Sequence, residues 1–169
     1  MSHAQQWLAV TDSEALQFFF ERLRGIAEDA PADDELLYNA SVLAHFATTS
    51  TVSMTDFPPG PISLTTVFDV FLLDRSQHAD PDIMEAAGSQ CLLLTGFFQD
   101  HLRHRHNVEW YGGLGADFYQ SAAHLGRNPT RRRLMETMAE RFGYWRRQQY
   151  RLAAELRDEP RLIHPERPI

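Results

Sequence analysis

Apolar residues recur along most of this chain at spacings of three and four residues, the period of one helical face. Proline and glycine interrupt the pattern, as at Pro31 and Gly126. No stretch of useful length alternates apolar and polar residues as a half-buried strand would. We therefore predict an all-α protein. The pattern predicts about six helices, at about 13–29, 33–49, 64–74, 81–104, 108–125 and 129–157. Three glycines near the start of the fifth leave a start at Ala116 as the alternative.

The predicted helix at 81–104 differs from the others because its sequence is apolar on nearly every side from Cys91 to Phe98. An amphipathic surface helix has one apolar stripe, whereas a helix that is apolar all round is buried. We therefore predict a single-domain bundle of about six helices that surround this central helix. The domain would span residues 1–159, and residues 160–169 would form a C-terminal coil.

Two glycines, Gly88 and Gly96, lie inside the predicted central helix. Each lowers helix propensity by roughly 1 kcal/mol relative to alanine. A cost of this kind inside a core helix is explained if another element must come very close. We therefore predict that another backbone approaches the helix at these two positions.

The last predicted helix carries an apolar seam with alternating spacings of three and four residues, typical of a coiled coil. The seam is longer than the facing helix at 13–29, so part of it would stay exposed. Exposed apolar strips mark interfaces, and we predict a two-fold homodimer. Alternatively, the loop at 48–63 or the N-terminal arm covers the strip and leaves a monomer. The seam consists of Met135, Met138, Phe142, Trp145, Gln149, Leu152 and Leu156, of which Met138, Phe142, Trp145, Gln149 and Leu152 are the interface candidates.

The segment at 48–63 contains three prolines and a glycine, which exclude a regular helix. Loops of this length in compact domains are often functional. The segment is either a proline-stiffened crossover or a loop beside a pocket between helices. The candidate pocket residues are His45, His101, His104 and Tyr111. In addition, Phe18 falls off the apolar face of the first helix, so we expect it to meet another element or a partner.

The charge is distributed unevenly along the 169 residues. Residues 1–100 hold 15 acidic residues and 3 arginines, whereas residues 101–169 hold 8 acidic residues and 13 arginines. Either the two halves pack together and complement each other, or the basic half faces an acidic partner. The arginines of the last helix could contact nucleic acid, but Glu136 and Glu140 interrupt the basic face. Nucleic-acid binding therefore ranks last among our hypotheses.

Several function classes lack their sequence signals. Cys91 is the only cysteine, which excludes an internal disulfide and a multi-cysteine metal site. No apolar window of about 18 residues predicts a membrane span, and the first residues do not read as a secretory signal. We therefore predict a cytoplasmic protein without a membrane partner.

The histidines His101, His104 and His106 are the strongest metal candidates, but Arg103 and Arg105 lie between them and would repel a cation. Neither HExxH nor a Glu-x-x-His pair is present. The chain also lacks GxSxG, P-loop and CxxC motifs. We therefore predict no metal and no cofactor, and we assign no catalytic residue.

The segment at 87–123 contains LLLTGFF, the pair Trp110–Tyr111, and Tyr119. In these residues it resembles a group of uncharacterised bacterial proteins that are all-helical. The resemblance covers about a quarter of the chain. It implies a bacterial, cytoplasmic, helical domain, and it implies no activity.

Two functional hypotheses remain. The first is a non-enzymatic interaction or regulatory protein that self-associates, supported by the seam and the missing catalytic motifs. The alternative is a small-molecule-binding helical protein, or an enzyme, with a pocket near the 48–63 loop. A cavity with converging polar groups would favour the second hypothesis.

Overall fold

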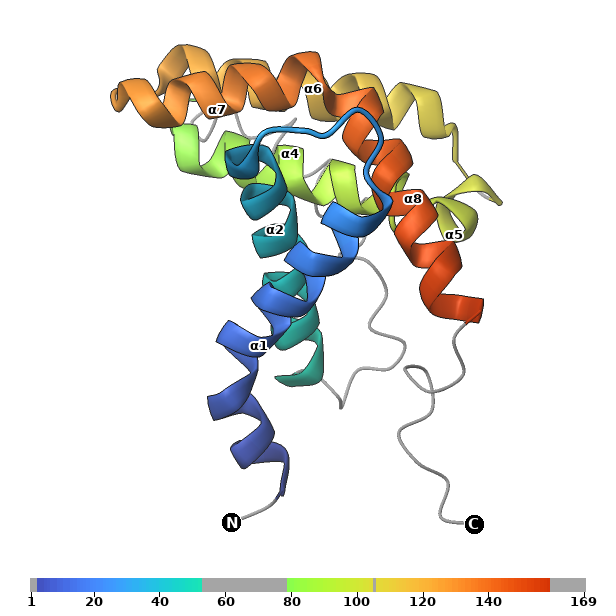
Figure 1. Cartoon of the computed structure of the whole chain (residues 1–169). Helices are drawn as coiled ribbons and strands as arrows, with labels where there is room; N and C mark the ends of the chain where they lie inside the picture. The colour runs from blue at the N-terminus through green and yellow to red at the C-terminus, as the bar shows by residue number, and fades with distance from the viewer. Residues whose placement is uncertain (1–2, 53–78, 105, 159–169) are drawn as a thin grey trace.

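The computed structural model describes residues 3–52, 79–104 and 106–158, and their regular structure is helical, without a strand. The prediction of an all-α protein is therefore confirmed for these ranges (Figure 1). The helices are α1 (His3–Ile26), α2 (Asp33–Val52), α4 (Pro81–Thr95), α5 (Gln99–Arg103), α6 (Val108–Leu125), α7 (Pro129–Glu140) and α8 (Phe142–Asp158).

Three helices begin where a short polar side chain caps the first turn. The carboxylate of Asp80 accepts from the Asp82 amide at 2.9 Å, ahead of Pro81 in α4. The side chains of Asn107 and Asn128 cap α6 and α7 in the same way. Each cap satisfies backbone N–H groups that lack a partner at a helix start, which fixes these boundaries locally.

Near the N-terminus the helices extend beyond the predicted limits. α1 begins at His3, so the predicted N-terminal arm is helical, and α2 continues to Val52 into the predicted loop. The rest of that loop, at 53–63, and the predicted helix at 64–74 lie outside the described residues. The predicted C-terminal coil at 160–169 also lies outside them.

The helices α1 and α2 lie side by side and descend together from the rest of the molecule (Figure 1). Their connection passes through Asp29 and Ala30, which have positive φ angles of 60° and 40°. The helix α8 holds this connection, because the hydroxyl of Tyr144 donates to the carbonyl of Glu28. Arg151 adds an ion pair to the Glu28 carboxylate at 3.1 Å.

The helix α4 packs most extensively on α6, and glycines allow the close contact. A Cβ atom at Gly88 would lie 3.0 Å from Cγ of the Tyr119 ring, so this glycine makes room for a side chain. At Gly96 a Cβ atom would lie 3.0 Å from the backbone oxygen of Arg146 in α8. The predicted backbone approach is therefore found at Gly96 and not at Gly88.

The predicted continuous helix at 81–104 is wrong, because the chain leaves the helical path at Gly96. α4 ends at Thr95, Gly96 has φ −103° and ψ −84°, and α5 begins only at Gln99. The approach of α8 at Gly96 and the low helix propensity of glycine explain the position of the break. Gly96, Phe97 and Phe98 form a turn between α4 and α5, so the two phenylalanines no longer follow the helical path of α4.

The predicted long helix at 129–157 also breaks, at Arg141, which has φ −103° and ψ 19°. α7 therefore packs on α6, while α8 turns toward α1 and α4. This change of direction buries the seam from Met135 to Leu152 inside the chain and leaves Leu156 partly buried, so the prediction of a leftover exposed strip is wrong. The five interface candidates are buried, with exposed fractions of 0% for Met138, Trp145, Gln149 and Leu152 and 4% for Phe142.

A buried polar network joins α2 to α8. Glu35 accepts from Nε1 of Trp145 at 3.0 Å and from Nε of Arg141 at 2.5 Å. Gln149, one of the predicted interface residues, instead donates from Nε2 to Oδ1 of Asn39 inside the chain at 3.1 Å. Because buried polar groups are costly without partners, this network specifies how α2 and α8 align.

Candidate ligand pocket

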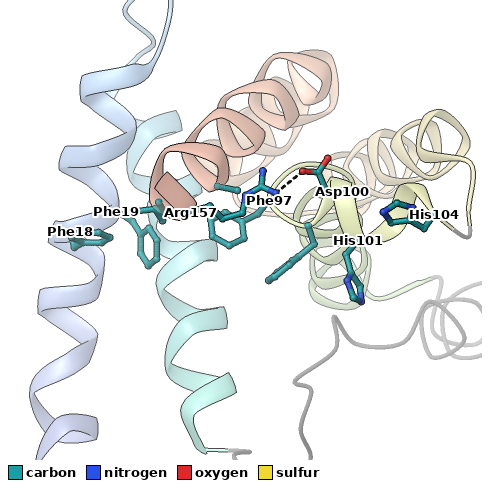
Figure 2. A pocket seen from close by; sticks show the side chains of 10 residues that line it. Phe18, Phe19, Phe97, Asp100, His101, His104 and Arg157 are labelled. Atoms are coloured by element: carbon teal, nitrogen blue, oxygen red, sulfur yellow. Dashed lines mark hydrogen bonds and ion pairs between the residues drawn. The ribbon is translucent and has the colours of Figure 1, made fainter. Parts of the chain in front are cut away.

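A hollow of about 730 Å³ lies between α1, the turn after α4, α5 and α8 (Figure 2). We call it the phenylalanine pocket, because four phenylalanine rings line it. Its volume falls within the range of small-molecule sites, about 300–1,000 Å³. The lining residues are Phe18, Phe19, Phe97, Phe98, Asp100, His101, His104, Ala153, Leu156 and Arg157.

The apolar wall is built from two pairs of adjacent phenylalanines. Phe18 and Phe19 of α1 pack edge to face with ring centroids 5.2 Å apart. Phe97 and Phe98 pack likewise at 5.0 Å, and Phe98 also contacts Phe46 of α2 at 5.0 Å. Edge-to-face contacts of this kind are favourable and hold the rings in fixed orientations. The break at Gly96 is what brings the second pair to the pocket.

The polar end of the pocket is organised by the carboxylate of Asp100. Its Oδ2 accepts from NH1 of Arg157 at 2.7 Å. Its Oδ1 accepts from the hydroxyl of Tyr150 at 3.1 Å and from Arg103. The hydrogen bond from Arg157, followed by that from Tyr150 and the charge of Arg103, lowers the pKa of Asp100. These hydrogen bonds join α5 to α8. In the cluster, the one carboxylate of Asp100 faces the guanidinium groups of Arg103 and Arg157.

His101 and His104 contribute two imidazoles to the same end. His101 lies on α5 and His104 directly follows it, and both side chains are exposed. Figure 2 shows them beyond the pair of Asp100 and Arg157, on the side away from α1. Two predicted pocket residues therefore line the pocket together.

The other two predicted pocket residues lie elsewhere. His45 is an exposed residue of α2 and does not line the pocket. Tyr111 is buried in a small apolar cluster with Leu94 and Leu102, where burial raises its pKa. The pocket was also predicted to lie near the 48–63 loop. Residues 53–63 of that loop lie outside the described part of the chain.

Sequence reasoning missed most of the lining, including the phenylalanine pairs and Arg157. A partial signal for the rings was present, because adjacent helical residues point about 100° apart, so one of two neighbours lies nearer the edge of the face that packs on the core. The expectation that Phe18 meets another element or a partner was of this kind. Arg157 carried no such signal, because its partner Asp100 lies 57 residues away along the chain.

A second hollow, of about 130 Å³, lies at the starts of α4 and α7. Three arginines line it, and two of them already have partners. Arg131 pairs with Glu85, and Arg132 donates to the carbonyl of Ala123 at 3.0 Å. Because this hollow is small, the phenylalanine pocket is the better candidate site.

Metal chemistry and thiol chemistry find little support in the described residues. No group of three or more His, Cys, Asp or Glu side chains there is arranged to hold a metal ion. Cys91 is buried, and burial raises its pKa to about 12, so its thiol is not activated as a nucleophile. Within the same ranges, each helix is too short or too polar to cross a membrane.

Comparison with protein-family models, with curated proteins and with solved structures finds no match for this chain. The resemblance of 87–123 to a bacterial helical group therefore stays a prediction. The functional argument rests on the geometry of the phenylalanine pocket.

Proposed function

We propose that this protein binds a small molecule with a largely apolar body in the phenylalanine pocket. The observation that carries this proposal is the convergence of two phenylalanine pairs, from α1 and from the turn after α4, on one hollow. Small-molecule sites are typically concave and mostly apolar, with a few polar groups that orient the ligand. Here the polar groups gather at one end, around Asp100.

The proposal favours the alternative hypothesis over a self-associating interaction protein. That first hypothesis rested in part on an exposed seam, and the seam residues from Met135 to Leu152 are buried inside the chain. A dimer stays a prediction, and it would have to use another surface. The exposed fractions of Leu37, 50%, and Trp110, 49%, mark two apolar positions where such a contact could form.

Binding also fits the polar end better than acid–base catalysis does. A general acid or base works best when its pKa lies near the working pH, which for a carboxyl group requires a raised pKa. The pKa of Asp100 is lowered, and its oxygens already accept hydrogen bonds from three side chains. Asp100 is therefore organised to hold Arg157 in place.

The test is titration of the full chain with 1-dodecanol, a neutral amphiphile, followed by calorimetry. We expect saturable binding of about one molecule per chain. The variant Ala153→Phe places a ring in the pocket, because Ala153 is a buried lining residue. It should weaken binding at least about tenfold, a change of 1.4 kcal/mol.

The matched control is Ala154→Phe, the same substitution at the next residue of α8, which does not line the pocket. It should bind 1-dodecanol as the natural chain does. Thermal melting of both variants checks that each is folded. The proposal fails if the natural chain shows no saturable binding, or if Ala153→Phe and Ala154→Phe bind equally well.

A further inference from the structure

We propose that the ligand is an amphipathic monoanion whose head group binds to Arg157 at the polar end of the phenylalanine pocket. This inference rests on the proposed function and deepens it. The apolar tail would lie among the four rings, and the head group would lie beside the pair of Asp100 and Arg157. Figure 2 shows Phe97 beside this pair, with Phe18 and Phe19 on one side and the two imidazoles on the other.

The hydrogen-bond donors at this end, and not its net charge, support an anionic head. The carboxylate of Asp100 faces the guanidinium groups of Arg103 and Arg157, and the carboxylate of Asp158 also attracts Arg157, so these four charges balance. Asp100 already accepts from three side chains. Arg157 has further N–H donors beyond the one that bonds to Asp100, and an anionic head would accept from them.

The geometry of Arg157 is suited to this role. Its side chain is 53% exposed, and the bond to Asp100 uses the terminal nitrogen NH1. A guanidinium group carries several N–H donors in one plane and can hold two carboxylates at once. Asp100 therefore orients Arg157, and the exposed remainder of the guanidinium can bind a carboxylate head from the pocket side.

A cationic head fits the same place poorly. The Asp100 carboxylate already accepts from Arg157, Arg103 and the hydroxyl of Tyr150, which leaves it about one acceptor position for a further donor. The cation would also approach two guanidinium groups. Charge complementarity thus selects between amphiphiles that share the same apolar tail.

The experiment compares three probes with one undecyl tail and different heads, each below the concentration at which it forms micelles or separates from solution. The probes are laurate, 1-undecanol and undecyltrimethylammonium, and calorimetry on the full chain gives each affinity. We expect laurate to bind about fivefold more tightly than 1-undecanol, the upper range for a partly exposed ion pair. The ammonium compound should bind more weakly than 1-undecanol.

The variant Arg157→Gln should lower the affinity for laurate to about that for 1-undecanol, and leave the affinity for 1-undecanol unchanged. Arg147→Gln is the matched control, because Arg147 is an exposed arginine of the same helix that does not line the pocket. It should change neither affinity. If Arg157→Gln does not fold, Arg157→Lys is used, which keeps the charge and should retain a preference for laurate, smaller than that of the natural chain.

The failures of the two proposals are distinguishable. If all three probes bind equally and Ala153→Phe weakens them all, the pocket stands and the anionic head is wrong. A loss of laurate affinity that is equal in Arg157→Gln and Arg147→Gln indicates general charge attraction and also overturns the inference. If the full chain binds none of the probes, the proposed function itself fails, as it would if a chain segment or a second copy filled the pocket.

Discussion

At the scale of single residues, the glycines of α6 show how closely the helices pack. A Cβ atom at Gly115 would lie 2.5 Å from Cζ of Phe142 and 2.7 Å from Cβ of Cys91. At Gly113, two residues earlier, a Cβ atom would meet no atom within 4 Å. One glycine is therefore required by packing, while the other only lowers the helix propensity of α6.

These two positions yield a matched prediction. Gly115→Ala should destabilise the protein by about 1–3 kcal/mol, because the methyl group overpacks the junction of α4, α6 and α8. Gly113→Ala should stabilise it by roughly 0.5–1 kcal/mol through helix propensity. Chemical denaturation of both variants measures the two changes. Equal effects of the same sign would show that Gly115 is not a packing constraint.

Residue patterns predicted the candidate site only in part. His101 and His104 were found because polar side chains beside an apolar segment are visible in sequence. The rings at 97–98 were assigned to the core of a continuous helix, since nothing local reveals that α8 approaches Gly96. The pairing of Asp100 with Arg157 is a contact between distant segments, and single-sequence patterns carry no information about it.

At the scale of elements, the short helix α5 depends on Asp100 for its attachment to α8. The carboxylate of Asp100 has a lowered pKa in the folded chain, chiefly through the hydrogen bond from Arg157. A carboxyl group with a lowered folded pKa stabilises the fold above its unfolded pKa, about 3.9. That contribution is lost as the pH falls through the folded pKa.

We therefore predict that Asp100→Asn melts at a lower temperature than the natural chain at about pH 6, and that the difference shrinks toward about pH 3. Melting temperatures across this range measure the effect. Asp117→Asn, at an exposed carboxylate of α6, is the control and should show a much smaller difference throughout. A difference for Asp100→Asn that stays the same at both pH values would contradict this account.

Helical periodicity predicted the elements better than their ends. The range of α6 was predicted at 108–125 and is Val108–Leu125, because Asn107 caps it and Gly126 follows it. The breaks at Gly96 and Arg141 were missed, since the helical periodicity of apolar residues continues across both.

At the scale of the whole molecule, the uneven charge is explained largely by pairing within the chain. Arginines of the basic half reach acidic residues of the first hundred in several ion pairs. These are Arg131 with Glu85, Arg141 with Glu35, Arg151 with Glu28, and Arg103 and Arg157 with Asp100. Of the two explanations for the asymmetry, packing of complementary halves is the one these contacts support.

The buried seam also changes what substitution of Trp145 should do. Trp145 is fully buried and donates to Glu35, so Trp145→Glu would place two carboxylates together in the core. We predict a loss of about 3–5 kcal/mol, comparable to breaking a buried ion pair. Arg147→Glu, at an exposed position of α8, should cost far less. Thermal melting decides: a folded, stable Trp145→Glu would show that the seam is not core.

Because of this burial, Trp145→Glu cannot serve as a test of the predicted homodimer. Light scattering of the natural chain tests that prediction directly. A mass near that of one chain, 19.4 kDa, would contradict the dimer. A dimer, if found, should lose its contact in Leu37→Glu or Trp110→Glu, since these residues are large, apolar and exposed.

The most direct test of the central claim, that the phenylalanine pocket holds an apolar ligand, is nuclear magnetic resonance on the full chain. Phenylalanine rings would be isotopically labelled, and the chain mixed with unlabelled laurate. The account predicts nuclear Overhauser contacts from the laurate methylenes to rings that line the pocket, Phe97 and Phe98 among them, and their loss in Ala153→Phe. Contacts that are absent, or that reach only rings outside the pocket such as Phe118 and Phe142, would contradict it.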